Sequence, residues 1–230
     1  MSEFIFITEV SPYRDAAGLA SLAGAHHSLP SAVVTAAQIA QVHRLSFRHV
    51  ARVTDLDVAD LEQARLLMLF TIGETDWSGE QRSVIERRVH RGDLRIVGMH
   101  SASDSSYHWP AYGDFIGARF AGHPVTGVLP VQVIDGQHPA TRHLQPTWAF
   151  NEELYLFSEL ADDRHDLLGV EFGRDRDGTG NQILPLAWCI ERGPMRTFYT
   201  ALGHFGAAYE NVDFVRHLGG GVAWALSDQP

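Results

Sequence analysis

The first hundred residues alternate between short apolar runs and segments with helical periodicity. The apolar runs, which we expect to be buried strands, are Phe4–Thr8, Phe47–Val53, Leu66–Thr71 and Leu94–Met99. Helical patterns run from Pro30 to about His43 and from Ser78 to about Arg91, the second opened by a capping box of Ser78 and Gln81. Strands and helices that alternate at this spacing predict a parallel sheet with crossover helices.

The second half of the chain has strand patterns with few helices between them. Five strands are expected there: Val128–Asp135, Glu153–Phe157, Leu167–Phe172, Ile183–Ile190 and Arg196–Ala201. Glu191–Pro194 is typical of a hairpin turn, and a helix over Ala207–Leu218 is expected to end at the glycines 219–221. We therefore predict one doubly wound α/β domain over residues 1–230. It would have a mainly parallel sheet, helices on both faces and an antiparallel extension.

The ionisable residues exclude several kinds of chemistry. All 18 basic residues are Arg, so the chain has no Lys for a Schiff base, a pyridoxal-phosphate anchor or a P-loop, and no nucleotide cofactor is expected. Its one Cys, Cys189, excludes an internal disulfide and a Cys-ligated metal cluster. A net charge of −10 argues against a nucleic-acid partner. The 13 His, with Asp, Glu, Tyr and Arg, remain for acid–base or metal chemistry.

The N-terminal segment does not resemble a targeting sequence. It carries Glu3 and Glu9 within and beside its apolar run and lacks the basic residues of a signal peptide. The longest apolar runs, such as Leu66–Phe70, are too short to span a membrane. We therefore expect a cytoplasmic protein without a membrane partner.

Histidines follow several of the expected strands, at the ends where open α/β sheets bind ligands. His26 and His27 lie in the loop after the first strand, His100 follows the strand that ends at Met99, and His204 follows the last strand. Of the adjacent pair we prefer His27, because it comes just before a helix start and neighbouring side chains seldom face the same way. The sequence therefore predicts a His-rich site at one edge of the sheet.

Residues 98–102 (GMHSA) have the pattern of a nucleophile elbow, which is a strand followed by a sharp turn between small residues. Its apex is His100 rather than Ser or Cys. A His at this position could be a general acid or base or a metal ligand. The alternative is a packing residue held by hydrogen bonds, and the convergence with His204 favours a functional role.

Seven segments along nearly the whole chain together resemble the ThuA-like family, which is named for trehalose utilisation. They are Ala25–Val33, Thr71–Asp76, Val97–Ser105, Trp109–Pro124, Glu152–Tyr155, Pro185–Trp188 and Arg196–His204. The resemblance implies a flavodoxin-like domain related to class I glutamine amidotransferases, in which His100 takes the position of the amidotransferase Cys and His204 that of its catalytic His. Cys189 lies within an expected strand and cannot replace the missing Cys, so glutaminase activity is not expected.

The resemblance also implies a role in carbohydrate catabolism, especially of disaccharides oxidised to 3-keto sugars. The family often has Asp-Glu before Leu-Tyr, where this chain has Glu152 and Glu153. The role of Glu152 therefore stays open, whereas Glu153, Tyr155 and Arg196 match the family pattern.

Acid–base chemistry on a keto sugar needs a base, an acid and a group that stabilises an oxyanion. We expect His100 and His204 to share the base and acid roles, and Glu153 to orient one imidazole or to be the base itself. Arg196, Tyr155 or one divalent metal (Zn, Mn or Fe) would stabilise the oxyanion. The candidate metal ligands are His27, His100, Glu153 and His204, and the candidate substrate-binding residues are His27, Asp104, Tyr155, Trp188, Arg196 and Trp109.

Two alternatives stay open at this point. The site residues could bond to one another and to water without a metal, or the protein could be a non-catalytic module that binds a sugar or a partner protein. The density of ionisable groups favours an isomerase, lyase or hydrolase acting on a small carbohydrate. His123 and His138, each before a Pro, are expected in turns. Phe205, Tyr209 and Phe214 could form a homo-oligomer face.

Overall fold

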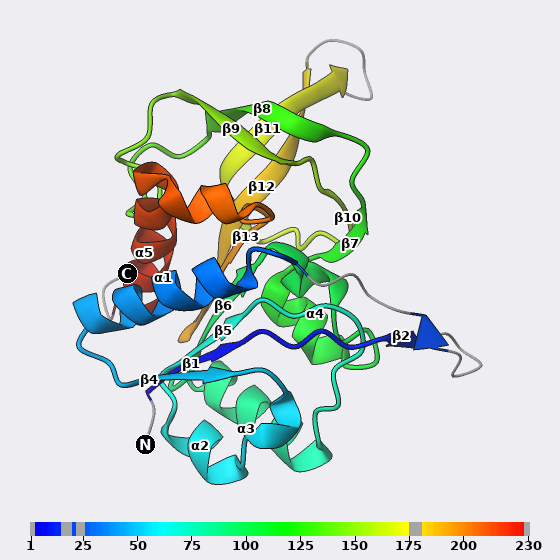
Figure 1. The fold of residues 1–230 in the computed structure, drawn as a ribbon, viewed down its shortest axis with the longest axis vertical. Coiled ribbons are helices and arrows are strands. Elements are labelled where there is room, and N and C mark those ends of the chain that lie inside the picture. The colour runs from blue at the N-terminus through cyan, green and yellow to red at the C-terminus, as the bar shows by residue number, and fades with distance from the viewer. Residues whose placement is uncertain (1–2, 15–19, 22–25, 175–180, 228–230) are drawn as a thin grey trace.

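A nine-stranded sheet forms the centre of the computed structural model, which describes residues 3–14, 20–21, 26–174 and 181–227. The strand order is β4-β1-β5-β6-β13-β12-β11-β8-β9 (Figure 1). The first five strands in this order are parallel, and the last four add an antiparallel extension. Their bounds are Phe47–Val50 (β4), Phe4–Ile7 (β1), Leu66–Leu69 (β5), Arg95–Met99 (β6), Met195–Thr200 (β13), Asn181–Arg192 (β12), His165–Arg174 (β11), Thr126–Val133 (β8) and Thr147–Glu153 (β9).

Two small two-stranded sheets and five helices complete the described fold. The small sheets pair β7 (Arg119–Gly122) with β10 (Leu156–Ser158), and β2 (Tyr13–Arg14) with β3 (Ala20–Ser21). The helices are α1 (Leu29–Val42), α2 (Val58–Gln63), α3 (Gly79–His90), α4 (Pro110–Ile116) and α5 (Val212–Leu226). The expected capping box of Ser78 and Gln81 opens α3. Three 3₁₀ turns cover Val53–Asp55, His100–Asp104 and Gly206–Glu210.

Helices cover both faces of the sheet, as two neighbouring residues of β13 show. Consecutive strand residues point to opposite faces. Phe198 packs against Gly221 of α5, while Tyr199 stacks on Trp188, whose indole donates a hydrogen bond to the Ile116 carbonyl of α4. In Figure 1, α1 lies on the same side of the sheet as α5. The predicted parallel half, antiparallel extension and two-sided helical cover are therefore observed.

Two expectations for the second half need correction. The strand expected at Glu153–Phe157 is two strands, because β9 ends at Glu153 and β10 begins only at Leu156. The glycines 219–221 do not end a helix but lie inside α5. Two of them are required by packing, because a Cβ on Gly220 would collide with the Pro139 carbonyl, and a Cβ on Gly221 with the Phe198 ring. Close packing, rather than chain termination, explains Gly220 and Gly221, whereas a Cβ on Gly219 would meet nothing within 4 Å.

Among the described residues, none of the helices combines the length and the apolar character that crossing a membrane would require.

Candidate functional site

His100 stands at a strained turn where β6 ends. Its backbone φ is 44°, a left-handed conformation that residues other than Gly rarely adopt. Just before it, Gly98 leaves no room for a side chain, because a Cβ there would lie 2.8 Å from Ile116 and 2.9 Å from Tyr199. A 3₁₀ turn over His100–Asp104 begins at this residue. The predicted elbow is therefore present, and strain at such a turn is typical of functional sites.

The His100 ring is fully buried, and its hydrogen bonds define its tautomer. Nδ1 lies 2.8 Å from the backbone carbonyl of Ala201, which can only accept, so Nδ1 carries the proton. Nε2 then presents its lone pair to the site, where the Tyr155 hydroxyl lies 2.9 Å away. Burial, followed by the neighbouring His26, holds the pKa of His100 well below 6.5. His100 is thus a neutral imidazole with a directed lone pair.

His204 faces His100 from the loop that follows β13. Its Nδ1 lies 3.1 Å from Nε2 of His100 and 3.2 Å from Oε2 of Glu153. Glu153 ends β9, and its Oε2 is also 3.6 Å from Nε2 of His100. Burial lowers the pKa of His204, although the Glu153 carboxylate acts in the opposite direction. The predicted catalytic trio of His100, His204 and Glu153 is therefore brought together.

Glu152, whose role the sequence left open, holds the backbone of this site. Its buried carboxylate accepts backbone N–H bonds from Gly203 at 2.5 Å, His204 at 3.1 Å and Glu153 at 3.0 Å. These bonds join the end of β9 to the loop after β13. Burial raises the pKa of Glu152 to about 7, although the three N–H donors favour the carboxylate.

His26, rather than His27, completes the cluster. Its ring centroid lies 4.7 Å from that of His100 and 5.2 Å from that of His204. Burial, followed by the charge of His204, lowers its pKa to about 4, and its buried Nε2 has no hydrogen-bond partner. His27 is exposed in the turn before α1. The preference for His27 is therefore corrected, because the turn points the two neighbouring rings in different directions.

The donor set of this cluster fits a divalent metal. One ligand atom each from His26, His100 and His204 lies within 4.8 Å of the others. Two ligands of a tetrahedral zinc ion are about 3.4 Å apart, close to the 3.1 Å that separates the facing nitrogens of His100 and His204. The buried Nε2 of His26 has no hydrogen-bond partner, and a bound metal ion would take up its lone pair. His100 donates its Nδ1–H to the Ala201 carbonyl. In metal sites a backbone carbonyl often accepts the second ring N–H of a ligating His in the same way and so fixes the direction of the ring.

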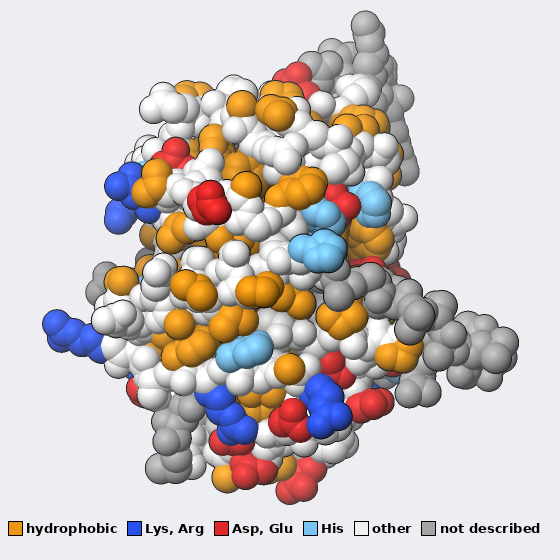
Figure 2. All heavy atoms as spheres, in the orientation of Figure 1, with side chains coloured by type: hydrophobic (Ala, Val, Ile, Leu, Met, Phe, Trp, Pro, Cys, Tyr) orange, Lys and Arg blue, Asp and Glu red, His pale blue; other side chains and the backbone are white. Residues whose placement is uncertain are grey.

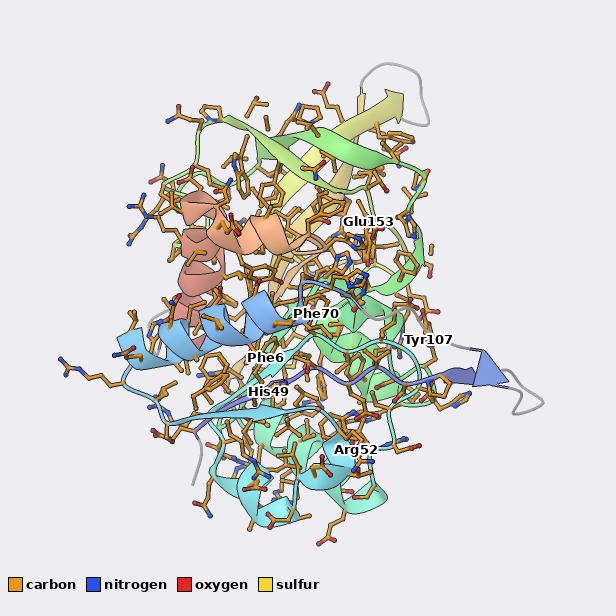
Figure 3. The ribbon with its side chains drawn as sticks, viewed as in Figure 1. Phe6, His49, Arg52, Phe70, Tyr107 and Glu153 are labelled. Carbon is orange, nitrogen blue, oxygen red and sulfur yellow. The ribbon has the colours of Figure 1, made fainter. Side chains whose placement is uncertain are left out.

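Aromatic side chains and one further His surround the cluster. Phe70 lies against both His26 and His100, and Tyr155 packs on His100 with ring centroids 4.6 Å apart. His123 stacks on Tyr155, and its Nδ1 lies 3.8 Å from Oε1 of Glu153. Sequence reasoning missed His123, because only the β7–β10 pairing brings its turn to the site. Figure 2 shows His side chains beside an acidic one on this face, and Figure 3 labels Phe70 and Glu153, which both contact the cluster.

Two of the predicted sugar-binding residues are Trp side chains that belong to the core instead. Trp188 is fully buried and donates to the Ile116 carbonyl. Trp109 is also buried and donates to the Glu86 carboxylate at 2.6 Å. Neither ring faces the cluster, so both predictions are corrected. Packing against residues of α4 sets the direction of both rings.

Arg196 and Asp104 differ in how they relate to the cluster. Arg196 is the second residue of β13, whereas His204 follows the end of this strand. Arg196 therefore lies at the opposite end of β13 from the cluster, where it binds Glu191 and Ser227. Its predicted oxyanion role is therefore corrected. Asp104 lies in the 3₁₀ turn after His100, where the Tyr107 hydroxyl donates to it at 2.6 Å. A sugar contact by Asp104 stays a prediction.

Residues 20–225 match the model of the ThuA family, described as trehalose utilisation. No curated protein sequence matches the chain. A protein from Bacteroides uniformis described as ThuA-like has a TM-score of 0.72 at 14% identity, covering 98% of this chain and 92% of that chain. One from Parabacteroides merdae, also described as ThuA-like, has a TM-score of 0.69 at 19% identity, covering 100% and 93%.

A part of a larger protein has a similar fold. The α-L-fucosidase isoenzyme 2 from Paenibacillus thiaminolyticus matches with a TM-score of 0.59 at 9% identity, covering 100% of this chain but 33% of that one. At such identities the structural similarities concern the fold alone.

Proposed function

Because this chain belongs to the ThuA (trehalose utilisation) family, we propose that it is an enzyme that acts on an oxidised (3-keto) sugar or disaccharide with the help of one divalent metal. The observation that carries the proposal is the convergence of three imidazoles with lowered pKa values beside a carboxylate and a tyrosine hydroxyl. Imidazoles that stay neutral at pH 7 are ready metal ligands, because no proton has to be displaced.

The metal would be held by His26, His100 and His204, with at least one position left for substrate. When bound, it would supply Lewis-acid polarisation of the sugar ketone. This assignment changes the expected role of His100. A buried imidazole whose pKa lies well below 6.5 is a weak base, so His100 serves better as a ligand than as a proton acceptor.

Glu153 is the better candidate for the base. Its side chain is 11% exposed, so substrate can reach it, and Oε2 is held 3.2 Å from Nδ1 of His204. A ketone acidifies the C–H bond beside it, and Glu153 would take that proton while negative charge develops on the ketone oxygen. Tyr155 would donate a hydrogen bond to that oxygen, because burial raises its pKa well above 10 and keeps the hydroxyl protonated.

Return of the proton to the neighbouring carbon would isomerise the sugar. Transfer of that proton instead to a glycosidic oxygen β to the ketone, as its C–O bond breaks and a C=C bond forms, would cleave a disaccharide. Both outcomes begin with the same proton removal. Acyl-enzyme chemistry is disfavoured, because the elbow holds His100 and Cys189 lies within β12. Burial also raises the pKa of Cys189 to about 12, so this thiol stays protonated.

The test combines metal analysis with turnover assays on protein without a His tag. We expect about one equivalent of metal in the wild type, its loss in His100→Ala, and conversion of 3-keto-trehalose but not of trehalose. Glu153→Gln should keep the metal and lose at least about 100-fold in turnover, whereas the exposed control Glu80→Gln should change neither. Wild-type turnover in Glu153→Gln, or in metal-free protein, would overturn the proposal. Saturable binding of the keto sugar without conversion would instead favour a binding module.

A further inference from the structure

His123 lies at the proposed active site, but the proposed mechanism gives it no role. Its side chain is 48% exposed, in contrast to that of Glu153 at 11% and that of His100, which is fully buried. Nδ1 of His123 lies 3.8 Å from Oε1 of Glu153, which is too far for a hydrogen bond. An exposed ring beside the proposed base is well placed to contact a substrate.

Backbone pairing on both sides fixes the turn that carries His123. Before this turn β7 pairs with β10, and after it β8 pairs with β9. Between these two pairs, the Leu154 N–H donates to the Val125 carbonyl at 2.8 Å. The segment that runs from β9 to β10 also carries Glu153 and Tyr155. The pairing therefore holds His123 at one place relative to both of these residues.

One face of the His123 ring is covered and the other is open. The ring is stacked on Phe120 and Tyr155, with centroids 5.9 and 6.4 Å away and interplanar angles of 30° and 26°. Because the Phe120 and Tyr155 centroids are themselves only 4.6 Å apart, both rings lie on the same side of His123. The exposed part of the imidazole is therefore on the opposite side.

The other aromatic rings that pack around the cluster offer less surface to a ligand. They are buried or half-buried, namely Phe70, Phe120, Tyr155 and Phe205. Tyr209 and Phe214, which were expected at a homo-oligomer face, are 8% exposed and fully buried, and they pack against each other in the core. That expected face is therefore corrected. Of the rings beside the cluster that are named here, that of His123 is the exposed one.

The chemistry of the proposed cleavage places the second sugar beside Glu153. The glycosidic oxygen that leaves is attached to the carbon next to the one that loses its proton, so the second sugar is joined to the keto sugar close to the base. Oε2 of Glu153 faces His100 and His204, where the keto sugar would bind. Oε1 faces His123 instead. The carboxylate thus has the metal cluster on one side and the His123 ring on the other.

We propose that the open face of His123 is the platform on which the second sugar ring of a keto-disaccharide packs. The face of an aromatic ring is negative, and it attracts the C–H groups that line one face of a sugar ring. Phe120 and Tyr155 support the imidazole from behind, so it need not be ordered when the sugar binds. The platform makes a disaccharide, rather than a single keto sugar, the preferred substrate. This inference rests on the proposed function, since it concerns the second half of the same substrate.

The test compares two substrates that share the keto ring and the leaving oxygen but differ in the second sugar. They are 3-keto-trehalose and methyl 3-keto-α-glucoside, in which a methyl group replaces the second glucose. Because their leaving groups differ in reactivity, the ratio of their kcat/KM values is compared between variants of the protein. We expect His123→Ala to lower this ratio, 3-keto-trehalose over the methyl glycoside, by about tenfold through a higher KM for 3-keto-trehalose.

Two further variants serve as controls. His123→Phe keeps a flat ring at this position and should keep the ratio within about threefold of the wild type. His165→Ala removes another exposed His that is paired with a carboxylate, that of Asp135 at 2.9 Å on the antiparallel side of the sheet, and should leave the kinetics of both substrates unchanged.

The possible results separate this inference from the proposed function. An equal fall in kcat/KM for both substrates in His123→Ala would overturn the inference, because His123 would then act on Glu153 or on the keto ring. A ratio as low in His123→Phe as in His123→Ala would also overturn it, because a flat ring would not be what the second sugar requires. Conversion of neither substrate by the wild type would contradict the proposed function itself, and the platform with it.

Discussion

The Nδ1 atom of His100 lies 2.8 Å from the backbone carbonyl of Ala201, so the ends of two neighbouring parallel strands are joined through one imidazole. β6 and β13 are paired along Ile96–Met99 and Thr197–Thr200, and this bond continues their contact beyond the sheet. Because the carbonyl only accepts, the opposite ring nitrogen must face the cluster without a proton. The fold thus determines the protonation pattern of the site as well as its geometry.

The hydroxyl of Tyr155 is predicted to contribute to the reaction as well as to stability. Tyr155→Phe removes the 2.9 Å bond to Nε2 of His100 but keeps a ring that packs on Phe120 and His123. We expect a loss of unfolding free energy of about 1–2 kcal/mol and a fall in kcat of about 10- to 100-fold with little change in KM. Urea unfolding and steady-state kinetics on the same preparation check both. An unchanged kcat would show that the hydroxyl does not stabilise the oxyanion.

Glu152 is predicted to make stability fall as pH rises towards neutrality. Its pKa is raised from 4.5 to about 7 by burial, so the folded protein holds this proton more tightly than the unfolded chain. The protonated group contributes about 3 kcal/mol to the unfolding free energy. This contribution is fully present below pH 4.5 and is lost as pH rises through about 7. Glu152→Gln, which is neutral at every pH, lacks this loss.

Urea unfolding at pH 5 and pH 8 measures the difference in stability between wild type and Glu152→Gln. We expect the unfolding free energy of the wild type, relative to that of the variant, to fall by about 2–3 kcal/mol from pH 5 to pH 8. Glu80→Gln, at an exposed position, serves as the control with a constant difference. If Glu152→Gln also gave a constant difference, Glu152 would be ionised throughout this range.

His217 is predicted to have the opposite pH dependence. It is fully buried, with Nδ1 2.9 Å from the Ala140 carbonyl and Nε2 3.1 Å from the Thr200 hydroxyl. Burial lowers its pKa to about 4, so its contribution to stability is complete above pH 6.5 and is lost as pH falls towards 4. His217→Gln, which cannot be protonated here, should be about 1–3 kcal/mol less stable than wild type at pH 8. The difference should shrink by about 2 kcal/mol at pH 5, as measured by urea unfolding; a constant difference would contradict the buried neutral form.

Local patterns were sufficient to predict the elbow and the parallel half of the sheet. The elbow depends on Gly98 and His100, which lie in one short segment, and the parallel strands follow from apolar runs separated by amphipathic helices. The match to the ThuA family over residues 20–225 confirms the resemblance. These features depend on residues close together in the chain, which is why periodicity and spacing reveal them.

Side-chain direction and long-range pairing were not predictable in the same way. The turn geometry before α1, rather than residue type, brings His26 instead of His27 to the cluster. His123 reaches Glu153 only because β7 pairs with β10, and neither of these strands had been expected as such. The distance of Arg196 from the cluster could have been predicted. It stands at the start of its strand and His204 follows the end, and the two ends of a strand lie far apart.

The adjacent glycines 219 and 220 inside α5 should respond to the same substitution in opposite ways. A Cβ on Gly219 meets nothing within 4 Å, so Gly219→Ala should stabilise the protein by about 0.5–1 kcal/mol through helix propensity. A Cβ on Gly220 would collide with the Pro139 carbonyl and lie 2.7 Å from the Cα of Ala140. Because backbone has to move, Gly220→Ala should cost about 1–3 kcal/mol. Thermal and urea unfolding of the two variants at one protein concentration check the pair. Stabilisation by both substitutions would mean that α5 does not pack closely against residues 139–140.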